Sequence, residues 1–484
     1  MQVLFISSEV ADIIKTGGLA DVAKALPLSL IKKGHTVKVV MPCYSSIQGV
    51  KELPVVATGA LNKDSYLEKK FAIRQKILND SLEIWLIEYD SYYARSSLYG
   101  DNNQAYSDNG ERFAFLAASA LEATKVMDFK PDIVHCNDWH AGLVPMILRI
   151  KYAKDEFFDK TRSVLTIHNG AFQGVFDRSQ INLIPEIQYI YNDMIYQGQY
   201  INFLKSGVFY ADKINTVSPG YAKELTTYLG GHGMTRNFQA RAADLSGIVN
   251  GCDYSDWDPS SDKHLLIRYD IKTLEEKILG KYFLQKRLNL AIGDTPIYGM
   301  VARLTDQKGI GILIPILENF LRHKVQIVIQ GTGDPKFADE LLKIQSRHKD
   351  KFVFISAYDE SMAHQIEAGS DFFLMPSIFE PCGLNQIYSL AYGTLPIVRS
   401  VGGLKDTVID YDSNKEAGNG FVFNEPSSDD LLSCMRRTLI FYLEDQDEMQ
   451  RIKRNAMRAN FNWDDSSEHY IAMYKDALTK PKWW

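Results

Sequence analysis

Short apolar runs alternate with segments of helical spacing through most of the chain. The run at 2–9 (QVLFISSE) predicts a buried strand, the segment at 19–34 has helical spacing, and the run at 35–42 predicts a second strand. A crossover of this length joins parallel strands, because antiparallel neighbours need only a short turn. The pattern therefore predicts an α/β fold built on doubly wound parallel sheets.

The same strand–loop–helix pattern continues to the end of the chain. In the first half, alternating stretches between 51 and 86 predict a hairpin that extends the sheet. Around 257–270 the pattern breaks into polar sequence with Pro, Ser and Asp, which is typical of a domain boundary. We therefore expect an N-terminal domain at 1–256, a C-terminal domain at 257–460, and a final helix at 461–484 that packs back on the N-terminal domain. Further strands are predicted at 132–136, 163–168, 213–217, 295–302, 325–330, 351–356, 371–377, 394–400 and 419–423.

Composition excludes several classes of protein. The 484 residues carry a formal net charge of -6 and a pI near 6.0, whereas a nucleic-acid binder would show a basic excess. No apolar run approaches the ~18 residues of a membrane helix. The five cysteines are odd in number and form no CxxC pair, which favours a reduced, cytoplasmic protein without a zinc site. We therefore expect no nucleic acid, no membrane and no metal among the partners.

The stretch FEPCGLNQ at 379–386 carries the most specific chemistry. It follows the predicted strand at 371–377, so Glu380 is expected at the carboxyl end of a parallel strand. Gly383 opens a segment of helical spacing at 384–393, and the free N–H groups of a helix start can hold an anion. A carboxylate beside an anion site is consistent only with a ligand that offers hydroxyls to one and phosphates to the other. This combination indicates a nucleotide-sugar.

A glycine-containing loop, KTGGLAD, lies at 15–21 between the first strand and the first helix. Gly17 and Gly18 would let a phosphate approach the backbone, and Lys15 would supply the counter-charge. The alternative interpretation is a tight turn that requires positive φ. The spacing does not match the GxGxxG of dinucleotide-binding folds. A similar sequence, GGLKDTV, recurs at 402–408, and a shared turn in two similar folds would explain it.

Three polar side chains follow strands in the first half. Asp138 and His140 come directly after the strand at 132–136, and His168 ends the strand at 163–168. Ligands of open α/β sheets bind at these carboxyl ends. Asp138 is therefore expected to face a cleft, whereas each histidine is either catalytic or a capping or packing group.

Two cations share the loop that follows the first strand of the second half. Arg303 and Lys308 would each be an ordinary surface cation if taken alone. Their position at the end of one strand, across from the helix that Gly383 opens, favours binding of a diphosphate instead. Two cations at ~4 Å, at an effective dielectric near ~20, would each stabilise a negative charge on such a diphosphate by about 4 kcal/mol before desolvation.

The ordered set of motifs resembles the bacterial glycogen synthases and the related plant starch synthases. The resemblance implies the GT-B architecture, in which two Rossmann-like domains face each other across a cleft. It implies retaining transfer of glucose from ADP-glucose to the non-reducing end of an α-1,4-glucan, with neither cofactor nor metal. The motifs are KTGGLADV, CNDWHA, TIHN with FQG, NTVSPGYAKE, ARLTDQKG, FEPCGLNQ and YGTLPIVRSVGGLKDTV.

The resemblance also implies roles for individual residues. The catalytic set is Asp138, His168, Arg303, Lys308 and Glu380. The substrate-binding set is Lys15, Gly17, Gly18, Asn250, Gly383, Leu384 and Asn385. The sequence departs from the family at Ile378, where bacterial members often have arginine.

Three alternatives remain at this stage. The donor could be UDP-glucose, the chain could be another GT-B glycosyltransferase, or it could be a glucan-binding protein without catalysis. A non-catalytic protein would be expected to have lost part of the charged set, and none of that set is missing.

Overall fold

The protein, described here from a computed structural model, forms two compact units. The structure describes residues 1–101, 104–189, 195–196 and 199–481. Unit 1 comprises Met1–Val217, Ala222–Gly251 and Trp463–Trp484, and unit 2 comprises Ser218–Tyr221 and Cys252–Asn462. Each unit contains a parallel-stranded sheet with helices, which is the fold class predicted from the sequence.

Unit 2 has a six-stranded sheet that is parallel throughout, in the order β17-β16-β15-β18-β19-β20. Counted along unit 2, this order is 3-2-1-4-5-6, the doubly wound arrangement of nucleotide-binding folds. The winding reverses between β15 and β18, so the loops after these two strands flank the position where such sheets bind ligands. The strands are β15 (Ile297–Val301), β16 (Gln326–Gln330), β17 (Phe352–Ile355), β18 (Phe372–Met375), β19 (Leu395–Arg399) and β20 (Phe421–Phe423).

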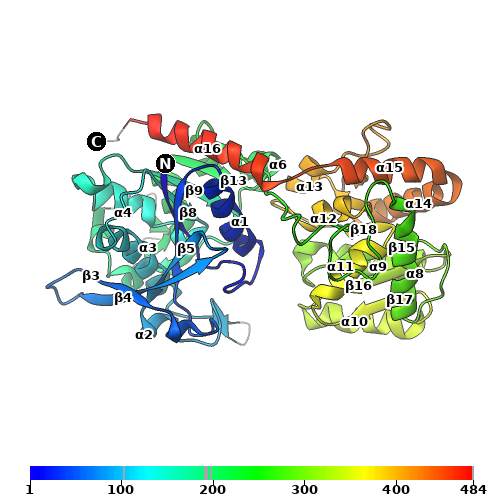
Figure 1. Cartoon of the computed structure of the whole chain (residues 1–484), viewed down its shortest axis with the longest axis horizontal. Coiled ribbons are helices and arrows are strands. Elements are labelled where there is room, and N and C mark those ends of the chain that lie inside the picture. The colour runs from blue at the N-terminus through cyan, green and yellow to red at the C-terminus, as the bar shows by residue number, and fades with distance from the viewer. Residues whose placement is uncertain (102–103, 190–194, 197–198, 482–484) are drawn as a thin grey trace. The chain divides into compact units, whose positions relative to one another are not determined.

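Helices cover both faces of this sheet (Figure 1). Tyr298 and Met300 of β15 face a core built with α9, α10, α14 and α15, whereas Ile297 faces a core built with α8, α11 and α13. Burial on both faces explains why these strands are continuous apolar runs in the sequence. The helices are α8 (Lys277–Arg287), α9 (Ile310–Phe320), α10 (Pro335–Arg347), α11 (Glu360–Gly369), α12 (Asn385–Ala391), α13 (Gly402–Thr407), α14 (Ser428–Glu444) and α15 (Gln446–Arg458).

Unit 1 has a nine-stranded sheet in the order β14-β13-β9-β8-β1-β2-β5-β4-β3. The winding reverses between β1 and β8, which pair in parallel. The hairpin predicted at 51–86 is present as β4 and β5, and β3 adds a further antiparallel edge. The strands are β1 (Gln2–Ile6), β2 (Thr36–Pro42), β3 (Val55–Leu61), β4 (Lys69–Leu78), β5 (Leu82–Glu88), β8 (Ile133–Asn137), β9 (Arg162–Ile167), β13 (Lys213–Thr216) and β14 (Leu245–Gly247).

The C-terminal helix α16 (Trp463–Thr479) belongs to unit 1, as the red ribbon in Figure 1 shows. It packs on α1 (Gly18–Lys32), where the hydroxyls of Ser29 and Ser467 are 2.9 Å apart. It also reaches the sheet, because the hydroxyl of Tyr474 is 2.6 Å from Nδ1 of the buried His135. The other helices of this half are α2 (Asp90–Tyr93), α3 (Asn109–Val126), α4 (Val144–Ile150), α5 (Phe203–Tyr210), α6 (Pro219–Leu225) and α7 (Thr235–Ala240).

Two small sheets of unit 1 were not predicted from the sequence. They consist of β6 (Gly100–Asp101) with β7 (Gln104–Ala105), and of β10 (Val175–Asp177), β12 (Tyr200–Asn202) and β11 (Ile195–Tyr196). Over the described ranges, no helix has both the length and the apolar character needed to cross a membrane.

Candidate active site

The switch point of unit 2 brings Lys308 and Glu380 into direct contact. Nζ of Lys308 lies 2.5 Å from Oε2 of Glu380, and the Ser377 hydroxyl donates to the same oxygen over 2.9 Å. The Glu380 side chain is only 7% exposed, so its charge is compensated inside the protein rather than by water. Within the described residues, Oε1 of Glu380 accepts no hydrogen bond. One carboxylate oxygen is thus held by the protein, and the other is available to a ligand.

The backbone holds the two loops of this pair against each other. The amide of Ile378 donates to the carbonyl of Gln307 over 2.8 Å. Gly309 has a φ of +73°, and a Cβ built there would lie 1.9 Å from the carbonyl oxygen of Pro376. Only glycine therefore allows the loop after β15 to approach the loop after β18 this closely. This approach is what positions the Lys308 ammonium on Glu380.

The residues that open α12 are placed beside the same loop. Gly383 adopts a φ of +74°, and Leu384 precedes the helix. The helix itself runs from Asn385 to Ala391, shorter at both ends than the segment 384–393 predicted from the sequence. Nδ2 of Asn385 donates to the carbonyl of Val301 over 2.8 Å, which ties α12 to the end of β15. All three predicted substrate-binding residues of unit 2 therefore lie at the switch point.

Arg303 follows β15 but does not join the Lys308–Glu380 pair. Its side chain is exposed, and among the described residues it forms no ion pair. The loop that carries it follows β15, one of the two switch-point strands, and is tied to the loop after β16 because Leu304 pairs with Gly333. The guanidinium of Arg303 is therefore exposed to solvent, whereas the Lys308 ammonium is held by Glu380.

The first loop of unit 1 is fixed by Glu9, a residue that the sequence analysis did not single out. The Glu9 carboxylate accepts hydrogen bonds from the amide and the hydroxyl of Thr16, the hydroxyl at 2.9 Å, and from the Tyr99 hydroxyl at 3.3 Å. Burial raises the pKa of Glu9, and the bonds from Thr16 act in the opposite direction. Lys15 is half exposed and its Nζ lies 2.7 Å from Oδ1 of Asp21.

The glycines of this loop do not adopt the conformation that the alternative interpretation requires. Gly17 has a φ of −159° and neither Gly17 nor Gly18 has a positive φ. A Cβ built on Gly17 would have no atom within 4 Å. The tight-turn interpretation is therefore wrong for this loop, and the space over Gly17 is open to a ligand.

Asp138 and His168 meet at the carboxyl ends of β8 and β9. Oδ1 of Asp138 accepts from the backbone amide of His168 over 2.7 Å and from that of Asn169 over 3.4 Å. Burial raises the pKa of Asp138 to about 7, although these two amides lower it. Asp138 also has a φ of +52°, an uncommon conformation for a residue with a side chain. A shifted pKa and a strained backbone at a strand end are typical of functional sites.

The neighbours of His168 determine which of its two ring nitrogens carries the hydrogen. Nδ2 of Asn137 donates to the carbonyl of Ile6 over 2.9 Å, which identifies Oδ1 of Asn137 as the acceptor. That oxygen lies 2.9 Å from Nε2 of His168, so Nε2 carries the hydrogen. Burial lowers the pKa of His168 to about 3, which keeps the ring neutral. Nδ1 is then a lone-pair acceptor, and it makes no hydrogen bond in the described part of the chain.

The remaining two candidates of unit 1 differ in environment. His140 is buried against Tyr99, Phe113 and Trp139, with ring centroids between 4.0 and 4.9 Å away, and burial lowers the pKa of His140 to about 3. This is the packing role that the sequence analysis gave as its alternative. Asn250 is 5% exposed, and its Oδ1 has no hydrogen-bond partner among the described residues.

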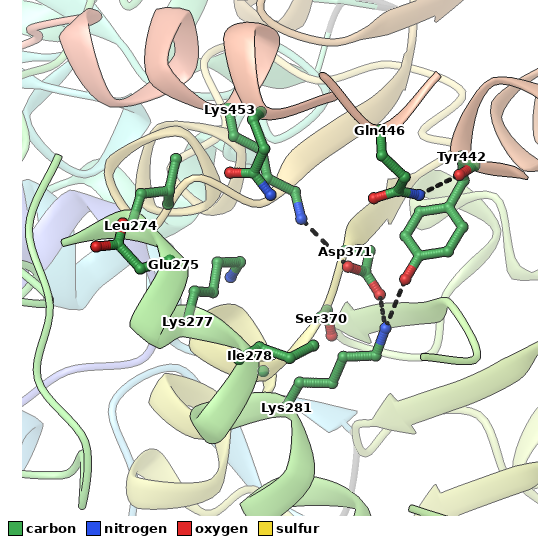
Figure 2. Close-up of a pocket in the computed structure, with 12 residues that line it drawn as sticks. Leu274, Glu275, Lys277, Ile278, Lys281, Ser370, Asp371, Tyr442, Gln446 and Lys453 are labelled. Atoms are coloured by element: carbon green, nitrogen blue, oxygen red, sulfur yellow. Dashed lines mark hydrogen bonds and ion pairs between the residues drawn. The ribbon is translucent and has the colours of Figure 1, made fainter. Parts of the chain in front are cut away.

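A separate cavity of about 70 Å³ in unit 2 holds a buried charge cluster at the opposite end of β18 (Figure 2). Asp371 lies 2.7 Å from Nζ of Lys281 and 3.3 Å from Nζ of Lys453, and the amide of Ile297 donates to it over 3.0 Å. Burial would raise the pKa of Asp371, but the two lysines outweigh it and lower the pKa to about 2. Asp371 precedes β18 whereas Glu380 follows it, so this cluster supports the sheet and is not part of the site.

The chain matches two families of known domains. The family described as "Starch synthase catalytic domain" matches residues 2–240, and "Glycosyl transferases group 1" matches residues 284–459. With the two parallel sheets and their charged switch points, these matches define a glycosyltransferase of the GT-B fold class.

Whole-chain comparisons are more specific. Glycogen synthase of Aeromonas hydrophila is 52% identical over 99% of both chains, and that of Photobacterium profundum is 50% identical over 98% of this chain and 94% of its own. The chain belongs to the glycogen synthase family, which confirms the resemblance drawn from its motifs. The solved catalytic domain of Starch Synthase IV from Arabidopsis thaliana, bound to ADP and acarbose, superposes with a TM-score of 0.88 at 30% identity, covering 99% of each chain.

Proposed function

We propose that this glycosyltransferase moves glucose from ADP-glucose to the non-reducing end of an α-1,4-glucan, with retention of configuration. The observation that carries the proposal is the buried Lys308–Glu380 pair at the switch point of a 3-2-1-4-5-6 sheet. The names of the relatives and the ADP bound to the starch synthase support the choice of donor and acceptor.

Unit 2 supplies the donor groups in this proposal. Arg303 and Lys308 stabilise the diphosphate as it gains negative charge, which is the largest contribution we expect to catalysis. The free Oε1 of Glu380 accepts hydrogen bonds from the glucose hydroxyls. The amides that begin at Gly383 and Leu384, with the side chain of Asn385, bind the phosphate end.

Unit 1 supplies groups for the reacting sugar and the acceptor. Nδ1 of His168, left as an acceptor by the bond at Nε2, binds a sugar hydroxyl. Asp138 holds the amide of His168 and so fixes the position of that ring. Lys15 and the backbone of Gly18, with the open space over Gly17, contact the diphosphate, and the unpaired Oδ1 of Asn250 binds substrate.

Retention follows in this proposal from attack on the face that the diphosphate leaves. The acceptor hydroxyl gives its proton to a donor phosphate oxygen, the new glycosidic bond forms, and the bond to the diphosphate breaks. Glu380 is not the nucleophile in this proposal, because its Oε2 binds Lys308 and Ser377 and its Oε1 accepts hydrogen bonds from the glucose hydroxyls. Trapping a glucosyl adduct on Glu380 would contradict this step.

A transfer assay with labelled ADP-glucose and labelled UDP-glucose on glycogen tests the proposal. We expect incorporation from ADP-glucose to exceed incorporation from UDP-glucose. Preference for UDP-glucose would assign the other donor, and binding of glycogen without incorporation from either would identify a non-catalytic glucan-binding protein. The five cysteines are buried and none of them is in a disulfide among the described residues, which supports a cytoplasmic location for the reaction.

A further inference from the structure

Three potential metal ligands from distant parts of the sequence meet in unit 2. Glu360 and His364 are four residues apart on α11, so they share one face of the helix. His264 comes from the segment that precedes α8. One ligand atom from each of the three lies within 4.8 Å of the other two. The sequence analysis expected no metal site because it considered cysteine pairs, and nothing in the sequence marks the distant His264 as a neighbour of Glu360 and His364.

The buried Asp262 fixes both histidines of this cluster. Its Oδ2 lies 2.8 Å from Nδ1 of His364, and its Oδ1 accepts the backbone amide of His264 over 2.7 Å. Since a carboxylate only accepts when ionised, Nδ1 of His364 carries a hydrogen, and Nε2 is the nitrogen that can bind an ion. Histidines that bind metals almost always donate their other ring N–H to such a carboxylate or carbonyl. Among the described residues, no hydrogen bond occupies Nε2.

The remaining ligands can close around an ion without movement of the fold. A zinc ion at ~2.1 Å from each ligand would place tetrahedral ligand atoms ~3.4 Å apart. The imidazole rings of His264 and His364 already have centroids 4.6 Å apart. Glu360 is exposed and His264 is half-buried, so neither side chain is locked by packing on all sides, and closure around an ion requires only side-chain rotation.

We propose that His264, Glu360 and His364 bind one divalent transition-metal ion of the zinc class, with water at the fourth position. Two imidazoles and one carboxylate form a ligand set that suits Zn²⁺, whereas Mg²⁺ and Ca²⁺ prefer oxygen ligands alone. Nothing in the proposed glucosyl transfer requires this ion, so the site is independent of that reaction.

The ion would join the segment at 252–270 to α11 and, through ring stacking, to α12. The Trp257 ring stacks on His364 at 3.7 Å between centroids and on Tyr388 of α12 at 3.8 Å, with interplanar angles of 12° and 1°. An ion on His364 would restrain this stack. We therefore assign the ion a stabilising role in unit 2.

Metal binding by the full-length protein tests the site. Chelator-treated protein is titrated with Zn²⁺ in competition with a chromophoric chelator, and with Co²⁺ while its visible absorption is recorded. We expect one equivalent of either metal, and a Co²⁺ spectrum of a low-coordinate nitrogen and oxygen site. His264→Gln and Glu360→Gln should each weaken Zn²⁺ binding at least ~10-fold, as loss of even an outer partner does.

His348→Gln is the matched control, because His348 forms another histidine–carboxylate pair of unit 2, 3.6 Å from Glu318. This variant should bind Zn²⁺ like the parent. The thermal midpoint should rise with Zn²⁺ in the parent and in His348→Gln, and rise less at the same Zn²⁺ concentration in the two ligand variants. The proposal is overturned if the parent binds no equivalent of Zn²⁺ at micromolar concentration. It is also overturned if parent and ligand variants bind Zn²⁺ with equal affinity, which would show an adventitious ion only. Either result leaves glucosyl transfer to be judged by its own assay.

Discussion

Neutralising Lys308 is the perturbation that tests the proposed reaction most directly. Its Nζ lies 2.5 Å from Glu380, and the two side chains are 20% and 7% exposed, so water screens this ammonium only in part. At an effective dielectric near ~20, a unit charge ~4 Å away contributes about 4 kcal/mol, and deletion of one such group commonly costs ~2.7–4 kcal/mol in the barrier. We therefore expect Lys308→Gln to lower kcat ~100- to 1,000-fold in transfer from labelled ADP-glucose to glycogen.

A second variant separates two causes of this loss. Lys308→Gln also leaves Glu380 buried without its cation, and an uncompensated buried charge disturbs the site by itself. The double variant with Glu380→Gln removes both charges and restores neutrality. The comparison is with Glu380→Gln alone, since Glu380 itself binds the sugar in the proposed reaction. If Lys308 stabilises the leaving diphosphate, the double variant stays at least ~100-fold below Glu380→Gln; if Lys308 only compensates Glu380, the two have equal activity. Lys336→Gln, at an exposed position on α10, is the control for loss of a lysine charge. A kcat for Lys308→Gln within threefold of the parent would refute the reasoning.

Three further predictions follow from other contacts. Gly17→Ala adds a methyl group into open space, so we expect thermal unfolding to show a stability loss of no more than about 1 kcal/mol. The KM for the donor should rise several-fold, because the methyl group occupies the space of the phosphate. An unchanged KM would show that no phosphate approaches Gly17. Burial raises the pKa of Asp138 to about 7, so between about pH 4 and pH 7 the folded protein keeps a proton that the unfolded chain releases. The free energy of unfolding therefore falls as pH rises through this window, with a slope of up to ~1.4 kcal/mol per pH unit. In urea unfolding, Asp138→Asn should lose this pH dependence. Lys281 and Lys453 hold the pKa of Asp371 near 2, so the contribution of its carboxylate to stability is present above about pH 4 and is lost as pH falls toward 2. Asp371→Asn should destabilise unit 2 by ~3–5 kcal/mol at pH 7, measured by hydrogen exchange of 371–375. A cost below ~1 kcal/mol would contradict the role of the cluster.

The sheets could be predicted because their strands are buried on both faces. A strand such as β18, with every side chain buried, leaves an uninterrupted apolar run that needs no knowledge of its neighbours. The predicted bounds, 371–377, are longer than the observed strand Phe372–Met375. The residues at 371, 376 and 377 are buried but do not pair in the ladder with a neighbouring strand, and the sequence pattern reports burial rather than pairing. The polar residue after each such strand was then predictable as a ligand candidate from the winding of the sheet alone.

Contacts between distant residues could not be predicted in the same way. Glu9 anchors the loop at 15–21 through Thr16, yet nothing in its local spacing distinguishes it from a surface carboxylate. The pair between Lys308 and Glu380 joins two loops that the sequence placed correctly, but their distance depends on the approach that Gly309 permits. Asp262 brings His264 and His364 together, but no sequence pattern around Asp262 marks it as the partner of two histidines. Each of these depends on tertiary packing rather than on periodicity.

The two GGL sequences show that one short motif can have two physical causes. A Cβ on Gly402 would lie 2.0 Å from the carbonyl oxygen of Glu380, and one on Gly403 would lie 2.2 Å from that of Cys382. These glycines are required so that α13 can pack against the backbone of the Glu380 loop. A Cβ on Gly17 would touch nothing. A shared turn therefore does not explain the similarity: in unit 2 the glycines admit the protein's own backbone, whereas the open space over Gly17 is what the donor phosphate would occupy. Alanine at 402 or 403 should accordingly lower the thermal midpoint in the absence of any substrate by more than alanine at 17 does.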